Sequence, residues 1–291
     1  MTRIIEYFSE ISSNYDAVFC DLWGCLHNGR RPLEAAVKAL EDFRDGGRIV
    51  LLLTNSPRPK ASVEIQLDEI GVARDLYHEV ATSGDSARSA LASGYFGTEI
   101  FHIGPERDAP FFASNDIPDL AKINRVPLDR AQSIVCTGLF DDQTETPEDY
   151  AVIFHEAKSR GMDLLCANPD IQVDLGEKRI FCAGALAKEY AQIGGLSHYF
   201  GKPHAPIYNL ARARLAITTG RIIDADRILC IGDGIGTDIL GAENENLDSL
   251  FVSGGLAAKE TSTNLQPDPK KLAHFLQLHN RKPTATIGHL R

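Results

Sequence analysis

Short apolar runs recur along the chain, and each ends on polar residues or on glycine. They cover residues 18–21, 49–55, 228–233 and 249–255. Runs that are apolar on both faces are typical of strands buried inside a parallel sheet. We therefore expect these strands to form one parallel sheet with helices on both faces.

Helical periodicity fills the intervals between the first runs. Between residues 32 and 45 the apolar positions Ala36, Val37, Leu40 and Phe43 repeat at helical spacing, and Gly46-Gly47 follows. This predicts a strand–helix–strand unit with a right-handed crossover. A second helix is expected over residues 61–70, ending at Gly71, which is well placed as a C′ glycine.

The middle of the chain carries its own set of elements. Strands are expected at 99–104, 133–138, 164–167 and 179–183, with an amphipathic helix over 148–160. The first sheet then resumes at 228–233. The sequence therefore predicts an α/β fold: a doubly wound parallel-sheet core (1–77 and 196–291) with an inserted, smaller α/β domain (78–195).

Composition supports a globular protein and narrows its partners. The chain has 291 residues, 43% of them apolar and 24% charged, which is enough for two domains. Its net charge of −10 argues against a nucleic-acid partner, because phosphate backbones require clustered Lys and Arg. A small phosphorylated ligand is still compatible with that charge.

Targeting signals and cysteine usage indicate a reducing compartment. The longest aliphatic stretch, 49–53, is too short to cross a bilayer, and the N-terminus has no signal-peptide core. We expect a cytoplasmic protein without a membrane partner. The six cysteines show no zinc-type spacing and are expected to be small buried hydrophobic residues. Cys25 is the exception: it lies near Asp21, and a reactive thiol there is the alternative interpretation.

Asp21 ends the first apolar run and is the first candidate for chemistry. Open α/β folds bind their ligands at the carboxyl ends of strands, so this aspartate suits a nucleophile or a metal ligand. An aspartate that only caps the following turn is the competing interpretation, and Asp21 alone does not decide between them.

Further polar residues at the ends of the other strands, or in the loops after them, favour the functional interpretation of Asp21. The set comprises Asp21, Thr54, Asn55, Lys202, Asp233 and Asp238. The three carboxylates are hard oxygen ligands of the kind that bind Mg²⁺. A lysine and a Thr/Asn pair supply a cation and hydrogen-bond donors for a phosphoryl group. Taken singly, Lys202 is also compatible with a solvated loop lysine and Asp238 with a helix N-cap.

The sequence does not match the two common nucleotide-binding motifs. The segment 232–238 lacks the third glycine of the dinucleotide fingerprint, and no acidic residue ends the next strand. A GxxxxGK[ST] loop is also absent from the sequence.

The ordered motifs resemble the haloacid dehalogenase (HAD) superfamily, specifically its class IIA phosphatases similar to NagD and to the phosphoglycolate and pyridoxal-phosphate phosphatases. They are Asp21-Leu-Trp-Gly-Cys-Leu-His-Asn-Gly29, Leu53-Thr-Asn-Ser56, Gly201-Lys-Pro-His204, Gly232-Asp-Gly-Ile-Gly-Thr-Asp238 and Ala167-Asn-Pro-Asp170. The resemblance covers nearly the whole chain. It implies a HAD-like Rossmannoid core with an inserted C2-type cap domain.

That resemblance also implies residue roles. Asp21 would attack phosphorus to give an aspartyl-phosphate, and Thr54 and Asn55 would hold the phosphoryl oxygens. Lys202 would orient the nucleophile and offset charge. The protein ligands of Mg²⁺ would be Asp21, the backbone carbonyl of Trp23, Asp233 and, directly or through water, Asp238.

Trp23 departs from the family pattern, because most phosphatases of the group have a second aspartate at this position. That carboxyl acts as general acid and base, a contribution of order 10²–10⁴-fold, and an indole cannot replace it. Three hypotheses follow: a phosphatase in which His27 takes over proton transfer, a catalytically weak protein that binds a phosphorylated metabolite, and a dehalogenase-like hydrolase. A second-shell or surface position is the competing interpretation for His27.

The inserted domain is expected to act as a lid over a small phosphorylated metabolite. Family members use such caps to exclude water and to read the leaving group. Asn168 and Asp170 are the candidate contacts there, although a structural Asn-Pro-Asp turn would look the same. Caps of this class often mediate dimers, so the resemblance implies a homodimer.

Overall fold

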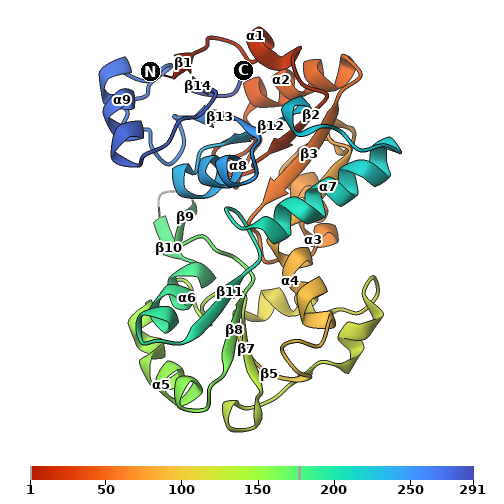
Figure 1. The fold of residues 1–291 in the computed structure, drawn as a ribbon, viewed down its shortest axis with the longest axis vertical. Helices are drawn as coiled ribbons and strands as arrows, with labels where there is room; N and C mark the ends of the chain where they lie inside the picture. Colours follow the sequence, from red (N-terminus) through yellow and green to blue (C-terminus); the bar gives the residue numbers. More distant parts are fainter. Residues whose placement is uncertain (1, 176–177) are drawn as a thin grey trace. The chain divides into compact units, whose positions relative to one another are not determined.

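The computed structural model describes residues 2–175 and 178–291, which divide into two compact units (Figure 1). The core unit comprises Met1–Thr54, Glu64–Ala81 and Lys202–Arg291, and the inserted unit comprises Asn55–Val63 and Thr82–Gly201. The expected boundaries at 77/78 and 195/196 lie a few residues earlier. In addition, the short segment 55–63 groups with the inserted unit, because Gly84 N donates to Ser56 O and Lys60 N donates to the Asp85 carboxylate.

The core unit is built on a seven-stranded sheet with the order β1-β14-β13-β12-β2-β3-β4. Its strands are β1 Arg3–Ile4, β2 Ala17–Cys20, β3 Ile49–Thr54, β4 Glu79–Thr82, β12 Ile228–Gly232, β13 Asp248–Val252 and β14 Ala285–Ile287. From β1 to β3 all neighbours are parallel. The four predicted strands are adjacent as β13-β12-β2-β3, so the predicted parallel α/β core is confirmed.

Helices cover the sheet of the core unit. They are α1 Ser9–Ser12, α2 Glu34–Asp45, α3 Lys60–Glu69, α7 Ala205–Thr219, α8 Leu240–Asn244 and α9 Pro269–Leu278, with the short helical turns η1 Arg74–Leu76, η6 Ala225–Arg227 and η7 Ile235–Ile239. Helix α3 continues from the inserted unit into the core unit. The predicted helices at 32–45 and 61–70 correspond to α2 and α3, and Gly71 follows α3 with φ +89°, a conformation that glycine tolerates best.

Packing on the sheet explains why the strand sequences are apolar on both faces. One hydrophobic cluster joins α7, through Tyr208 and Leu215, to Phe19 of β2. Another joins α9 to β13, where the rings of Phe251 and Phe275 stack with centroids 6.0 Å apart. Strands β2 and β12 are buried along their whole length, so polar residues are left for the strand ends.

The inserted unit contains a second parallel sheet with the order β11-β8-β7-β5-β6. Its strands are β5 Glu99–Ile103, β6 Asn124–Arg125, β7 Ser133–Cys136, β8 Asp163–Cys166 and β11 Leu196–Tyr199, beside an antiparallel pair β9 Gln172–Leu175 and β10 Lys178–Phe181. The helices are α4 Ser83–Ala92, α5 Ala151–Ser159 and α6 Ala183–Gln192, with the turns η2 Glu106–Phe112, η3 Pro118–Lys122, η4 Leu128–Arg130 and η5 Pro147–Tyr150. The predicted strand at 179–183 therefore belongs to the hairpin, outside the larger sheet.

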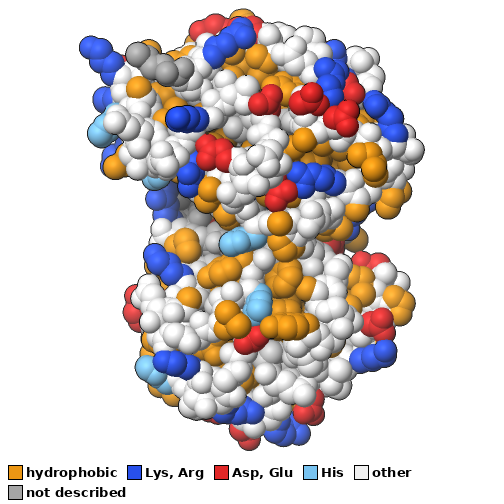
Figure 2. Space-filling model, viewed as in Figure 1, with side chains coloured by type: hydrophobic (Ala, Val, Ile, Leu, Met, Phe, Trp, Pro, Cys, Tyr) orange, Lys and Arg blue, Asp and Glu red, His pale blue; other side chains and the backbone are white. Residues whose placement is uncertain are grey.

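Two surface properties bear on partners. Acidic and basic side chains are intermixed on the face drawn in Figure 2. Within the two described ranges, no helix combines the length and the apolar character needed to span a bilayer.

Candidate functional site

The carboxyl ends of the central strands bring the predicted residues of the core unit to one edge of the sheet. Asp21 follows β2, Thr54 ends β3 and Asp233 follows β12. The register pairs Cys20 with both Ile231 and Leu52, so these three strands end side by side. Parallel strands with matched ends place their following residues together, which is why positions far apart in sequence can form one site.

Lys202 lies at the centre of this group and is almost completely buried, with 2% of its surface exposed. Its ammonium group donates to Asp21 Oδ1 at 2.5 Å, to Asp238 Oδ1 at 2.7 Å and to the Leu53 carbonyl at 3.1 Å. A buried ammonium is stable only with such partners. The contacts fix the Asp21 carboxylate and offset part of the negative charge around it.

Asp238 is held by the loop that follows β12. It lies on η7, and its Oδ2 accepts a hydrogen bond from Gly234 N at 3.0 Å. A side chain on Gly232 would overlap the Asp238 carboxylate, so glycine at that position leaves room for it. The glycine spacing in this loop thus serves a carboxylate rather than a dinucleotide.

Asp233 is the most confined carboxylate of the group. Its Oδ2 accepts from Leu256 N at 2.9 Å, and a Cβ on Gly24 or Gly255 would overlap it. Burial raises the pKa of Asp233 well above its ordinary value, and the nearby negative charges of Asp21 and Asp238 raise it further. A cation bound beside these carboxylates would remove that repulsion, so their environment fits a metal ion.

Three of these side chains lie close enough together to hold a metal ion. One ligand atom each from Asp21, Cys25 and Asp233 lie within 4.8 Å of one another, and all three residues are buried. Carboxylate oxygens suit a hard divalent cation such as Mg²⁺. Cys25 is the unexpected member: its position near Asp21 was visible in the sequence, but its approach to Asp233 depends on the fold.

Trp23 is held in the turn after Asp21 by contacts with its own loop. The indole meets the His27 ring edge to face, with centroids 5.4 Å apart and an interplanar angle of 69°. Gly29 has φ +82°, and a Cβ there would overlap the indole. The backbone N–H groups of Leu26 and His27 both donate to Leu22 O, which closes the turn.

His27 is buried beneath this turn, with 1% of its surface exposed. Its Nδ1 accepts a hydrogen bond from Gly29 N at 3.0 Å, and burial lowers its pKa to about 4. The ring is therefore neutral near pH 7 and one of its nitrogens is engaged. This arrangement suits support of the loop better than proton donation.

The other predicted residues, Asn55, Asn168 and Asp170, lie in the inserted unit. Asn55 Nδ2 donates to Asp170 Oδ1 at 2.9 Å, and Asp170 N donates to Asn168 Oδ1 at 3.0 Å. The Asn-Pro-Asp turn and the residue after β3 are therefore directly connected. Thr54, one residue earlier, is buried in the core unit.

Sequence reasoning missed Ser83 in the same part of the inserted unit. Its hydroxyl is buried and has no hydrogen-bond partner among residues 2–175 and 178–291, and a Cβ on Gly201 would crowd both Ser83 Oγ and Asn55 Oδ1. The available signal was its position, since Ser83 directly follows β4 as Asn55 directly follows β3.

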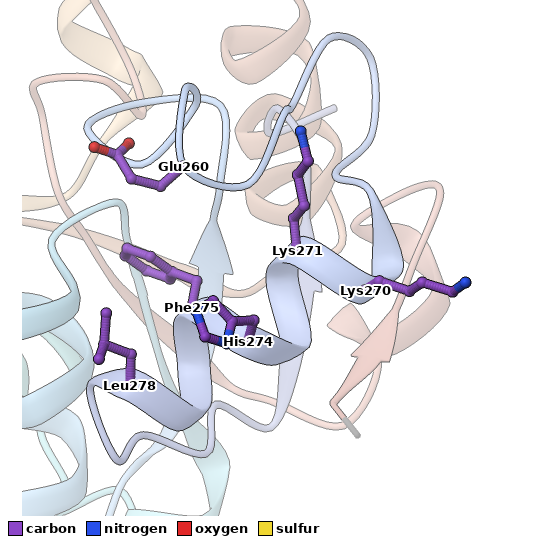
Figure 3. A pocket seen from close by; sticks show the side chains of 6 residues that line it. All are labelled: Glu260, Lys270, Lys271, His274, Phe275 and Leu278. Atoms are coloured by element: carbon purple, nitrogen blue, oxygen red, sulfur yellow. The ribbon is translucent and has the colours of Figure 1, made fainter.

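A pocket of about 430 Å³ lies elsewhere on the core unit, along α9 (Figure 3). Its lining consists of Glu260, Lys270, Lys271, His274, Phe275 and Leu278, none of which belongs to the predicted site. Lys270 points away from the other labelled side chains.

Family comparisons agree with the fold and with the positions of the motifs. Residues 18–117 match the haloacid dehalogenase-like hydrolase family, and residues 199–277 match a HAD-hydrolase-like family. The 5'-nucleotidase YutF of Bacillus subtilis is 24% identical over 264 residues, which cover 90% of this chain and 95% of that protein.

Solved structures also relate this chain to haloacid dehalogenase-like hydrolases. A crystal structure of a haloacid dehalogenase-like hydrolase from Brucella suis is 40% identical, with a TM-score of 0.86 over 99% of this chain and 100% of the other. Glycerol phosphate phosphatase from Mycobacterium tuberculosis, solved in complex with magnesium, is 25% identical with a TM-score of 0.67, covering 96% and 76%. On this evidence the chain belongs to the haloacid dehalogenase-like hydrolase family.

Proposed function

We propose that the chain is a Mg²⁺-dependent phosphatase for a small phosphorylated metabolite, with Asp21 as nucleophile and with proton transfer impaired at Trp23. The observation that carries this proposal is the contact of buried Lys202 with Asp21 and Asp238, beside Asp233. This set combines a fixed carboxylate, a cation and ligands for a divalent metal in one place. The names of the similar proteins, a nucleotidase and a glycerol phosphate phosphatase, support the substrate class.

Three hard carboxylates at one place support a divalent cation such as Mg²⁺, and the pKa of Asp233, raised by burial and then by Asp21 and Asp238, is consistent with one. We propose Asp21, Asp233, Asp238 and the backbone carbonyl of Trp23 as its protein ligands. When bound, the ion would neutralise charge on the transferring phosphoryl group and relieve repulsion between the carboxylates.

The proposed reaction proceeds in two displacements. An Asp21 carboxylate oxygen forms a bond to phosphorus while the bond from phosphorus to the leaving oxygen breaks. Water then attacks the aspartyl-phosphate, releasing phosphate and restoring Asp21. Lys202 orients Asp21 and offsets charge, and Thr54 and Asn55 are proposed to hold the phosphoryl oxygens.

Trp23 determines which substrates this chemistry serves well. An alkyl leaving oxygen needs a proton as the bond to phosphorus breaks, and the indole N–H is not an acid near neutral pH. Acyl and nitrophenyl leaving groups depart without that proton. We therefore expect substrates with good leaving groups to react much faster than sugar phosphates.

His27 as the replacement acid and base is the weaker version of this proposal. The hydrogen bond from Gly29 N to Nδ1 and the lowered pKa both keep the ring neutral and anchored. We propose that His27 acts mainly by holding the Trp23 turn.

A second candidate function follows from Trp23 itself. A protein that keeps the metal and phosphate ligands but lacks the acid and base is suited to bind a phosphorylated metabolite without rapid turnover. The dehalogenase-like alternative is less well supported, because the acidic cluster around Asp233 fits a phosphoryl ligand and its metal.

The test is a screen of phosphorylated metabolites and nitrophenyl phosphate with Mg²⁺, run beside the variant Asp21→Asn. Release of phosphate by the natural protein and its loss in the variant would support Asp21 as nucleophile. Activity that persists in Asp21→Asn would refute it. Mg²⁺-dependent retention of a metabolite with no turnover over hours would favour the binding function.

Other features stay predictions. Asn168 and Asp170 are proposed to face the substrate's leaving group, through a cap that closes over the site. The homodimer and the cytoplasmic location also remain predictions from sequence.

A further inference from the structure

Cys25 places a sulfur atom among the carboxylates of the proposed metal site. The residue lies four positions after Asp21, at the base of the turn that carries Trp23, and none of its surface is exposed. The proposed phosphatase chemistry does not use it. A buried thiol directed at two carboxylates therefore calls for another explanation.

The geometry around this thiol is that of a ligand group. Its sulfur lies within 4.8 Å of a carboxylate oxygen of Asp21 and of one of Asp233. No hydrogen bond involves the Cys25 side chain among the residues that the structure describes. Within the described ranges the sulfur is thus completely buried beside polar groups and without a hydrogen-bond partner.

Sulfur changes the kind of cation that such a group favours. Carboxylates and carbonyls suit Mg²⁺, whereas a thiolate selects softer ions such as Zn²⁺ and Cd²⁺. Zinc bonds of about 2.3 Å to sulfur and about 2.0–2.2 Å to oxygen are compatible with ligand atoms that lie several ångströms apart. One thiolate and two carboxylates give three protein ligands and leave a fourth position open.

We propose that Cys25, Asp21 and Asp233 bind a thiophilic divalent cation, of the class of Zn²⁺, Co²⁺ and Cd²⁺, at the place where the proposed function puts Mg²⁺. This inference takes only the location of the metal site from the proposed function. On binding, the S–H bond breaks, a metal–sulfur bond forms and the proton passes to solvent. No oxidation or reduction is involved.

This binding mode has a consequence for regulation. The thiophilic cation takes up carboxylate oxygens of Asp21, the proposed nucleophile, so it competes with Mg²⁺ and inhibits turnover. Removal of the cation by a chelator restores the Mg²⁺ form. Sensitivity of the site to soft metals is thus a specific effect of the cysteine at position 25.

Cys20 offers a matched control. It is also a buried thiol of the core unit and immediately precedes Asp21. However, its sulfur donates to the Asp21 backbone carbonyl at 3.2 Å, and it is not part of the group formed by Cys25 with Asp21 and Asp233.

The experiment is a titration of the full chain with Co²⁺, recorded by absorption spectroscopy. A thiolate bound to cobalt gives an intense charge-transfer band in the near ultraviolet that oxygen ligands do not give. We expect this band in the natural protein and in Cys20→Ala, and its loss in Cys25→Ser. Competition between Co²⁺ and Cd²⁺ should show that Cys25→Ser binds Cd²⁺ at least about tenfold more weakly than the natural protein. Even the loss of a second-shell partner lowers metal affinity by this factor.

Thermal unfolding with Mg²⁺ separates the possible failures. Cys25→Ser and the apolar variant Cys25→Val should both be stabilised by Mg²⁺, which shows that the site is intact without the thiol. Stabilisation of the natural protein by Mg²⁺ without a cobalt–thiolate band would overturn this inference and leave the proposed function standing. A band of equal strength in Cys25→Ser would also overturn it. Absence of stabilisation by either ion would overturn both.

Discussion

Lys202 and Asp21 form a buried ion pair, with 2.5 Å between Nζ and Oδ1, although 181 positions separate them in the sequence. Asp21 follows a strand of the core sheet, and Lys202 begins the last segment of the chain that returns to that unit. The pair therefore forms only when the core is assembled from both halves of the sequence.

Lys202→Met should lower both the turnover rate and the free energy of unfolding. The substitution leaves Asp21 and Asp238 buried without their shared cation, which costs about 3–5 kcal/mol in the free energy of unfolding. Turnover should fall by at least about 10²-fold, because a preorganised charge at the nucleophile is lost. Denaturant unfolding and phosphate release measure the two effects.

Lys122→Met is the control for that loss. Lys122 pairs with Asp119 on the surface, where exposed ion pairs contribute about 0–1 kcal/mol. Equal destabilisation by the two substitutions would contradict the role given to burial at Lys202.

Trp23→Asp should increase the hydrolysis of alkyl phosphates. A carboxyl at position 23 supplies the missing acid and base, a gain of order 10²–10⁴-fold, whereas nitrophenyl phosphate should change little. The measurement is the ratio of kcat/KM for the two substrate types. Trp23→Asn removes the same contacts with His27 and Gly29 without adding an acid. If it raised the rate equally, the gain would come from space rather than from proton transfer.

Gly255→Ala should weaken Mg²⁺ binding by at least about tenfold. A methyl group at position 255 would overlap the Asp233 carboxylate and displace it. The loss of a positioned ligand is expected to cost at least as much as the loss of a second-shell partner. Calorimetric titration with Mg²⁺ gives the affinity. Gly236→Ala is the local control, since a Cβ there meets nothing within 4 Å. Unchanged affinity in Gly255→Ala would place the metal away from Asp233.

His102 should make the inserted unit sensitive to acid. Burial lowers its pKa from 6.5 to about 4, and its Nε2 lies 3.0 Å from Thr137 Oγ1. Between about pH 4 and pH 6.5, His102 is protonated in the unfolded chain but neutral in the folded one, so the unfolded chain binds more protons. The free energy of unfolding therefore has the full contribution of His102 above pH 6.5 and loses it as pH falls toward about 4.

His102→Gln should flatten the fall in stability over that pH window, while keeping a hydrogen-bonding group near Thr137. Denaturant unfolding at several pH values tests this, with a substitution of the exposed His155 on α5 as control. An unaltered pH profile in His102→Gln would show that other groups carry the acid sensitivity.

Asp170→Ala should alter substrate binding through Asn55. The Asp170 carboxylate accepts from the Asn55 amide and thereby fixes its orientation. If Asn55 holds the phosphoryl group as proposed, KM should rise several-fold with a smaller change in kcat. Asp170→Asn keeps the acceptor oxygen and should restore part of the loss. A change confined to kcat would point instead to the chemical step.

Local sequence patterns were sufficient for the core strands and for the first helices. Strands β2, β3, β12 and β13 were visible because a strand buried on both faces must be apolar throughout. Helix α2 was visible because its apolar positions repeat at helical spacing. The short strands β1, at the edge of the sheet, and β14, beside it, were not predicted, because two or three residues carry too little periodicity to recognise.

The candidate site residues could be named from the sequence only as an ordered set, because Asp21, Lys202 or Asp238 taken singly also fits a turn, a loop or a helix cap. The sequence by itself determined a parallel α/β core and the kinds of atom available at its edge. Only the tertiary structure decided that Lys202 contacts Asp21 and Asp238. It also decided that buried His27 accepts a hydrogen bond from Gly29 N, and that the Cys25 sulfur lies within 4.8 Å of an Asp233 carboxylate oxygen. The reason is physical: contacts between residues distant in sequence depend on strand register and on burial, which exist only once the chain has folded.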